Sequence, residues 1–142
     1  MHVDVPMANI HIYDIDEKER DVLERGLTGH TFVFHPDPIS LETISSEADI
    51  ISIFVSSTVT TEMLEKMPNL KLIACRSAGY NNVPVYEADK RGIDVVVVPS
   101  YGEHTVAEFA FARLLGLTRK VHEAVKVVKD SACLDPLMIR GI

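Results

Sequence analysis

Two short apolar runs, separated by one helix-length segment, constrain the fold of this chain more than any other feature. The runs are residues 72–75 and 95–98, and the segment between them, residues 83–91, ends at Gly92. Continuous apolar runs of this length, joined by a helical crossover, are typical of parallel strands that are buried on both faces. Each run ends in a loop of small or polar residues, and ligands bind at the carboxyl ends of the strands in such sheets.

The same alternation of strand and helix patterns extends towards the N-terminus. Strand patterns occupy residues 8–13, 31–35 and 50–55, and helix patterns with cap or stop signals occupy residues 14–25 and 62–67. Ser40 is expected to cap a further element before the third strand. Five units of about 20 residues predict an α/β fold, a three-layer parallel sheet with helices on both faces. The expected strand order is the flavodoxin-like order 2-1-3-4-5.

The last third of the chain predicts one long connecting helix. Residues 103–128 contain no proline and one glycine, and only two residues between Val106 and Leu117 are charged. A helix that is apolar almost all round needs to be buried on every side, and one sheet covers only one side. We therefore expect residues 1–100 to form one domain. Residues 101–142 are expected to form a connecting helix and linker that a second domain or subunit covers.

Composition excludes several classes of partner. The 142 residues carry a formal net charge of −7, without a cluster of lysine and arginine, which argues against nucleic acid and anionic membranes as partners. No apolar run approaches the ~20 residues of a membrane span, and the N-terminus lacks a signal-peptide pattern. Cys75 and Cys133 have no disulfide or metal spacing, which fits a reducing compartment. We expect a cytoplasmic protein.

The loop after residues 72–75 is a candidate anion site. Ser77, Ala78 and Gly79 follow the strand closely, and small residues at this point can present backbone N–H groups to a carboxylate or phosphate. A tight strand–helix turn that binds nothing has the same composition, and the loop alone does not separate the two interpretations.

The loop after residues 95–98 carries Tyr101 at the expected start of the long helix. Ser100 and Glu103 have the spacing of a capping box, so part of this motif is a helix start. The Tyr101 hydroxyl is placed to donate to a ligand in the neighbouring loop, although a surface tyrosine in a helix cap has the same pattern. The hydroxyls of residues 56–58 either form a wall of the same pocket or belong to a polar loop.

Histidines give little indication of a metal site. His104 and Glu108 lie four residues apart on one helix face, but no third ligand is positioned by the sequence, and we expect no metal. His30 and His35 flank the second strand and are interpreted as strand-end residues without partners.

A spaced set of residues in the second half of the chain resembles the D-isomer-specific 2-hydroxyacid dehydrogenase family, in its substrate-binding (catalytic) domain. The family pattern runs P-x-L-K-x-I-x-x-x-x-x-G, then A…G-I-x-V-x-x-V-P, then Y-x-x-x-x-V-A-E. Members similar to D-lactate dehydrogenase are the nearest, chiefly through Tyr101. The matching residues are Pro68, Leu70, Lys71, Ile73, Gly79, Ala88, Gly92, Ile93, Val95, Val98, Pro99, Tyr101, Val106, Ala107 and Glu108.

The resemblance implies roles for individual residues. The backbone N–H groups of Ala78 and Gly79 would bind the substrate carboxylate, Tyr101 would contact the substrate, and Ser77 and Tyr80 would shape the pocket. The helix between Val106 and Leu117 would contribute to a homodimer interface. Asn81 and His104 depart from the residues usual in the family, Asp and often Asn, and receive no role.

The resemblance also implies what these residues lack. The family's NAD-binding domain has a G-x-G-x-x-G turn, which does not occur in this sequence, and the family's catalytic arginine, acid and histidine lie beyond the matching part. The parent enzyme would interconvert a 2-oxo acid and a D-2-hydroxy acid with NAD. The 142 residues alone would bind no NAD and hold no catalytic residue. Alternatively, they are a peptide-binding module like the family's corepressors, or a separate dimerisation or regulatory product.

Overall fold

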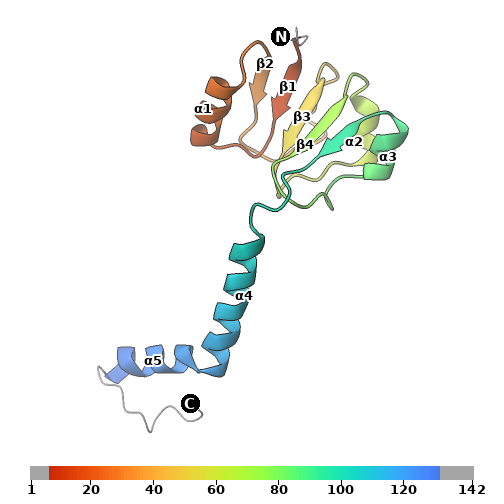
Figure 1. Ribbon diagram of the computed structural model, residues 1–142. Helices are drawn as coiled ribbons and strands as arrows, with labels where there is room; N and C mark the ends of the chain where they lie inside the picture. Colours follow the sequence, from red (N-terminus) through yellow and green to blue (C-terminus); the bar gives the residue numbers. More distant parts are fainter. Residues whose placement is uncertain (1–6, 132–142) are drawn as a thin grey trace, which may run out of the picture. The chain divides into compact units, whose positions relative to one another are not determined.

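The computed structural model describes residues 7–131. The chain divides into two compact units, one ending at Pro99 and the other beginning at Ser100, and each unit is described by itself (Figure 1).

The first unit is built on a five-stranded parallel sheet with the order β2-β1-β3-β4-β5 (Figure 1). This confirms the predicted fold class and strand order. Register along the centre of the sheet pairs Ile51 of β3 with Ile73 of β4, and both side chains are fully buried. The strands are β1 (Asn9–Ile12), β2 (Thr31–Phe34), β3 (Ile50–Ile53), β4 (Leu72–Cys75) and β5 (Asp94–Val96).

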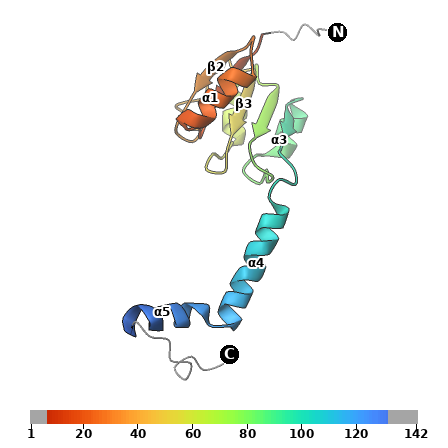
Figure 2. The ribbon, with the colours of Figure 1, turned by 60° about the vertical axis from the view of Figure 1, so that its left-hand side comes forward.

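Helices lie on both faces of this sheet: α1 (Glu17–Gly26), α2 (Thr61–Lys66) and α3 (Val85–Lys90). On one face, Leu23 of α1 packs against a small cluster that contains Ile10 and Ile12. On the other face, Leu64 of α2 and Ala88 of α3 belong to the larger core that also contains β3 and β4 side chains. The two ribbon views place α1 and α3 on opposite sides of the sheet (Figures 1 and 2).

The segment between β2 and β3 differs from the expectation, because it forms a turn instead of a helix. The Ser40 backbone N–H donates to Oγ1 of Thr43 at 3.0 Å, and the Thr43 N–H donates to the Ser40 carbonyl at 3.1 Å. Side chains that hydrogen-bond to nearby backbone in this way offer the chain an alternative to helix.

The second unit contains two helices, α4 (Glu103–Thr118) and α5 (Val121–Ser131), so the prediction of one continuous helix was wrong. Oγ1 of Thr118 donates to the carbonyls of Leu114 and Leu115. Lys120 then adopts a left-handed conformation, with φ of 52°, which ends the helix. No proline or glycine marks this break, which is why the sequence pattern runs through it.

The start of α4 also differs from the predicted capping box. Gly102 is the N-cap residue, and no side chain among residues 7–131 caps the helix. Ser100 has a left-handed backbone with φ of 57°, and its hydroxyl donates to Oε1 of Glu103 at 3.0 Å. The Ser100–Glu103 pair therefore forms, but it joins two side chains and leaves the first N–H groups of the helix uncapped.

Candidate functional site

The loop after β4 borders a pocket of about 220 Å³ at the carboxyl end of the sheet. The pocket is lined by Val55, Ser77, Gly79, Asn81 and Asn82. Two of the five predicted site residues, Ser77 and Gly79, thus lie in one pocket.

The remaining predicted site residues do not line this pocket. Ala78 lies between its two lining neighbours, and Tyr80 follows them with its side chain 52% exposed. Tyr101 belongs to the second unit, where its side chain is exposed and makes no hydrogen bond within the described residues.

Ser77 is fixed from both sides. Its side chain is buried, and its hydroxyl donates to the Gly79 carbonyl at 2.8 Å. Its own carbonyl accepts the Val98 N–H at 3.0 Å, which ties the loop to the segment after β5. The Ser77 hydroxyl is therefore used to shape the loop.

Two backbone donors of the loop have no acceptor in the described part of the chain. Within residues 7–131, the N–H groups of Ala78 and Gly79 donate to no protein acceptor, and both residues are exposed. A Cβ added at Gly79 would meet no atom within 4 Å, and Gly79 has no left-handed φ, so the fold itself does not require glycine here. Because Gly79 has no side chain, an anion such as a carboxylate can closely approach these two adjacent N–H groups.

Asn82 was not singled out from the sequence, yet it connects this loop to the loop after β3. Its Nδ2 donates to the carbonyls of Ser57 at 2.6 Å and Phe54 at 3.3 Å. Its own carbonyl accepts the Val59 N–H at 2.9 Å. Two consecutive asparagines in a turn are a common turn signal, and nothing in the pattern distinguishes Asn82 from its neighbour.

The hydroxyls that follow β3 do not line the pocket. Ser57 is fully buried, and its Oγ accepts the Ile39 N–H at 2.9 Å. Ser56 donates from its hydroxyl to Oδ1 of Asp14 at 2.6 Å. The pocket wall on this side is formed by Val55 instead.

A larger hollow of about 660 Å³ lies beside the start of α1, but it is acidic. It is lined by Asp14, Ile15, Asp16, Glu17, Glu19, Pro36, Phe54 and Ser56. The side chain of Asp16 accepts the Glu19 N–H and the Glu19 side chain accepts the Asp16 N–H, forming a capping box. Four carboxylates and a capped helix start would repel an anionic substrate, so the smaller pocket is the better carboxylate site despite its size.

The interpretation of the flanking histidines as residues without partners was wrong. Nε2 of His35 lies 3.1 Å from Nδ1 of His11, and the His35 ring stacks on Tyr13 at 4.3 Å. His30 accepts the Ala8 N–H through Nδ1. Burial lowers the pKa of both His11 and His35, and for His11 the proximity of His35 lowers it further, while Glu47 opposes this. Burial raises the pKa of Tyr13 to about 12.

Within the described part of the chain, no three His, Cys, Asp or Glu side chains are grouped to hold a metal ion, and His104 and Glu108 gain no third ligand. None of the helices described is long and apolar enough to cross a membrane.

Comparison with known proteins finds a matching family and several relatives. Residues 10–133 match the family model described as D-isomer specific 2-hydroxyacid dehydrogenase, catalytic domain. A 2-hydroxyacid dehydrogenase homolog of Zymomonas mobilis is 39% identical over 107 residues, covering 72% of this chain and 32% of that protein. A glyoxylate reductase of Korarchaeum cryptofilum is 32% identical over 134 residues, covering 86% of this chain and 40% of that protein.

A solved structure has the same fold. The D-lactate dehydrogenase of Aquifex aeolicus, complexed with NAD and lactic acid, is similar with a TM-score of 0.79 at 28% identity. The similarity covers 86% of this chain and 37% of that one. The chain spans about a third of the length of the relatives that it matches.

Proposed function

Because the chain belongs to the D-isomer specific 2-hydroxyacid dehydrogenase family, through its catalytic domain, we propose that the loop after β4 binds the carboxylate of a 2-oxo or D-2-hydroxy acid. The observation that carries this proposal is the pair of N–H groups at Ala78 and Gly79, which have no acceptor among residues 7–131 and lie beside a pocket without carboxylates. Ser77 shapes the pocket, Tyr80 lies exposed beside the loop, and Tyr101 contacts the bound substrate.

The whole protein, on this proposal, is an oxidoreductase that interconverts a 2-oxo acid and a D-2-hydroxy acid with NAD, as a D-lactate dehydrogenase does. NAD supplies the hydride acceptor when it is bound, and a separate acid–base group must move the hydroxyl proton. The contribution of the residues described here is to hold and orient the substrate carboxylate.

The residues described here do not fit a dinucleotide. Pyrophosphate binding needs free N–H groups at a glycine-rich turn and a helix start, as in the G-x-G-x-x-G motif. The turn after β1 instead carries Asp14 and Asp16, and the start of α1 is capped by its own carboxylates. We therefore propose that these 142 residues, by themselves, bind no NAD and catalyse no hydride transfer.

The proposed domain organisation assigns residues 1–100 to substrate binding and residues 101–142 to connection and dimerisation. The division of the chain between Pro99 and Ser100 supports this boundary. None of the α4 side chains is buried within the described structure, and the apolar residues between Val106 and Leu117 remain exposed. Such a surface is expected to pair with a second copy.

Binding of pyruvate to the 142-residue chain, measured by ligand-observed NMR, tests the carboxylate site. Methyl pyruvate is the matched control, because it keeps the 2-oxo group and lacks the carboxylate. We expect pyruvate to bind and the ester to bind at least tenfold more weakly. Equal binding of both compounds, or binding of neither, would contradict the proposal, and oxidation of NADH by the chain with pyruvate would contradict its inactivity alone.

A further inference from the structure

A single guanidinium lies where three strands of the sheet end. Arg76 is the first residue after β4, and its backbone N–H donates to the Ile53 carbonyl of β3 at 2.8 Å. Its Nη1 donates to Oγ of Ser52 at 3.0 Å. Its Nη2 donates to the carbonyls of Tyr13 at 2.8 Å and Asp14 at 2.6 Å. The side chain thus joins the ends of β1, β3 and β4.

These contacts direct the charge of Arg76 into the protein. The guanidinium lies over the Phe54 ring, 5.8 Å from its centre, and its Nε is buried without a partner among the described residues. Burial lowers the pKa of Arg76, although an arginine keeps its charge at neutral pH. Arg76 does not line the pocket that contains Ser77 and Gly79. The cation that adjoins Ser77 in the sequence therefore makes its hydrogen bonds away from the candidate carboxylate site.

The carbonyls that Arg76 holds belong to an unusual turn. Asp14 has a left-handed φ of 55°, a conformation that few residues other than glycine adopt. Its carboxylate accepts hydrogen bonds from the Ser56 hydroxyl and, at 3.4 Å, from the Phe54 N–H. The forked side chain of Arg76 and the carboxylate of Asp14 together fix the turns after β1 and β3 relative to the start of the β4 loop.

We propose that Arg76 is a positioning residue for the substrate carboxylate, a role that rests on the proposed function of the β4 loop. The far side of the loop is fixed by Ser77, through its bonds to Gly79 and Val98. The near side, directly after β4, is fixed by the hydrogen bonds of the Arg76 guanidinium. With both sides held, the N–H groups of Ala78 and Gly79 face one ligand. The planar guanidinium, which forms hydrogen bonds to two carbonyls and a hydroxyl at once, provides this positioning. The positive charge does not.

Two substitutions separate geometry from charge: Arg76→Lys keeps the charge and loses the fork, and Arg76→Met loses both. We expect pyruvate to bind at least tenfold more weakly to each variant than to the unaltered chain. The matched control is Arg91→Met, which removes an exposed cation of the same unit and should leave affinity within twofold. Restoration of affinity by lysine, a similar loss in Arg91→Met, or unchanged affinity in both Arg76 variants would overturn the proposal.

A third variant covers the case in which the Arg76 variants fail to fold, as judged by thermal melting. Ser52→Ala removes only the acceptor of Nη1 and is expected to fold and to bind about threefold more weakly; unchanged affinity would contradict the positioning role. If the unaltered chain binds no pyruvate, the proposed function fails, and the role of Arg76 fails with it. If pyruvate binds equally to the unaltered chain and to the Arg76 variants, only the role of Arg76 fails.

Discussion

Around Gly79, the side chains and the backbone of the loop after β4 have different roles. The Ser77 hydroxyl and the Arg76 guanidinium are used for internal hydrogen bonds, while the N–H groups of Ala78 and Gly79 have no acceptor in the part of the chain that the structure describes. The space around Gly79 is open, and its backbone is not left-handed. Because the fold does not require glycine at position 79, a substitution there can lower ligand affinity without lowering stability.

Gly79→Ala should leave the free energy of unfolding unchanged or raise it by about 0.4–1 kcal/mol, because alanine restricts the unfolded chain. The added methyl group stands where a carboxylate approaches, so we expect pyruvate affinity to fall at least tenfold. Urea unfolding and ligand-observed NMR measure the two effects.

The matched control is Gly29→Ala. Gly29 has a left-handed φ of 85°, so alanine there should destabilise the fold by about 1 kcal/mol and leave pyruvate affinity unchanged. A ligand-binding role of Gly79 would be contradicted if Gly79→Ala destabilised the fold as much as Gly29→Ala and bound pyruvate normally.

The burial of His11 and His35 makes stability depend on pH, and their proximity to each other adds to the effect on His11. Both pKa values are lowered in the folded state, so below about pH 6.5 the unfolded chain binds more protons than the folded chain. The free energy of unfolding should therefore fall as the pH decreases from about 7 to about 5. Urea unfolding at a series of pH values measures this slope.

The substitution that tests this cause is His35→Gln, which removes one titrating ring and keeps a polar group near His11. We expect a flatter pH profile between about pH 7 and about pH 5 in this variant. An unchanged slope would assign the effect to other groups.

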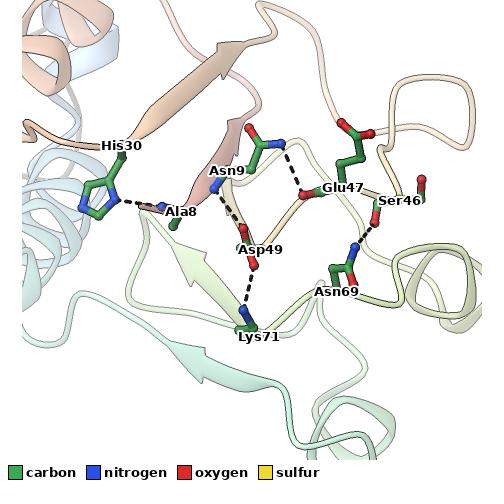
Figure 3. A network of polar contacts seen from close by, with 8 residues as sticks. All are labelled: Ala8, Asn9, His30, Ser46, Glu47, Asp49, Asn69 and Lys71. Atoms are coloured by element: carbon green, nitrogen blue, oxygen red, sulfur yellow. Dashed lines mark hydrogen bonds and ion pairs between the residues drawn. The ribbon is translucent and has the colours of Figure 1, made fainter. Parts of the chain in front are cut away.

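At the scale of elements, the opposite end of the sheet is held by a polar network around Asp49 (Figure 3). Oδ2 of Asp49 accepts the Asn9 N–H at 3.0 Å, and Oδ1 accepts Nζ of Lys71 at 2.8 Å. The hydrogen bond from Lys71 is the largest cause of the lowered pKa of Asp49, followed by the bond from Asn9. These contacts join the starts of β1, β3 and β4.

Asp49→Ala should lower the free energy of unfolding by about 1–2 kcal/mol, because the Asn9 N–H loses its acceptor. Lys71→Met should cost less, about 0–1 kcal/mol, since the lysine is 76% exposed and the Asn9 bond remains. Urea unfolding at neutral pH compares the two variants. An equal loss of unfolding free energy in both variants would assign the stabilisation to the Asp49–Lys71 ion pair and not to the hydrogen bond from the Asn9 N–H.

The elements that could be predicted are those with a continuous local signal. The β3 and β4 strands are apolar runs between turn residues, and their positions and order followed from that pattern. The break between α4 and α5 did not, because a left-handed lysine, Lys120, carries no such signal. The pairing of His11 with His35 depends on the β1–β2 register, which places His11 opposite Val33, and adjacency in the sequence does not reveal it.

The same limit applies to the candidate site. Small residues after a buried strand located the loop, so Ser77, Ala78 and Gly79 could be proposed from the sequence. Asn82 and Arg76 act through hydrogen bonds to segments about 25 to 63 residues away in the chain. Such contacts arise only when the parallel sheet brings the strand ends together.

At the scale of the whole molecule, the exposed apolar side chains of α4 predict self-association. Phe109 and Leu115 are among them, and the described structure buries no residue of the helix. We expect sedimentation equilibrium to show a dimer that Phe109→Glu shifts towards monomer. Val22→Glu, at a similarly exposed apolar position of α1, is the control and should leave the dimer intact. A monomer at high concentration of the unaltered chain would contradict the dimer.

On the proposed function, Ala78 and Gly79 hold a substrate carboxylate through their backbone N–H groups. Titration of the ¹⁵N-labelled chain with pyruvate, followed through backbone amide resonances, tests it most directly. We predict that the Ala78 and Gly79 amide resonances move more than any others in the first unit, and that methyl pyruvate leaves them in place. Saturable shifts elsewhere, with these two amides unmoved, would contradict the claim.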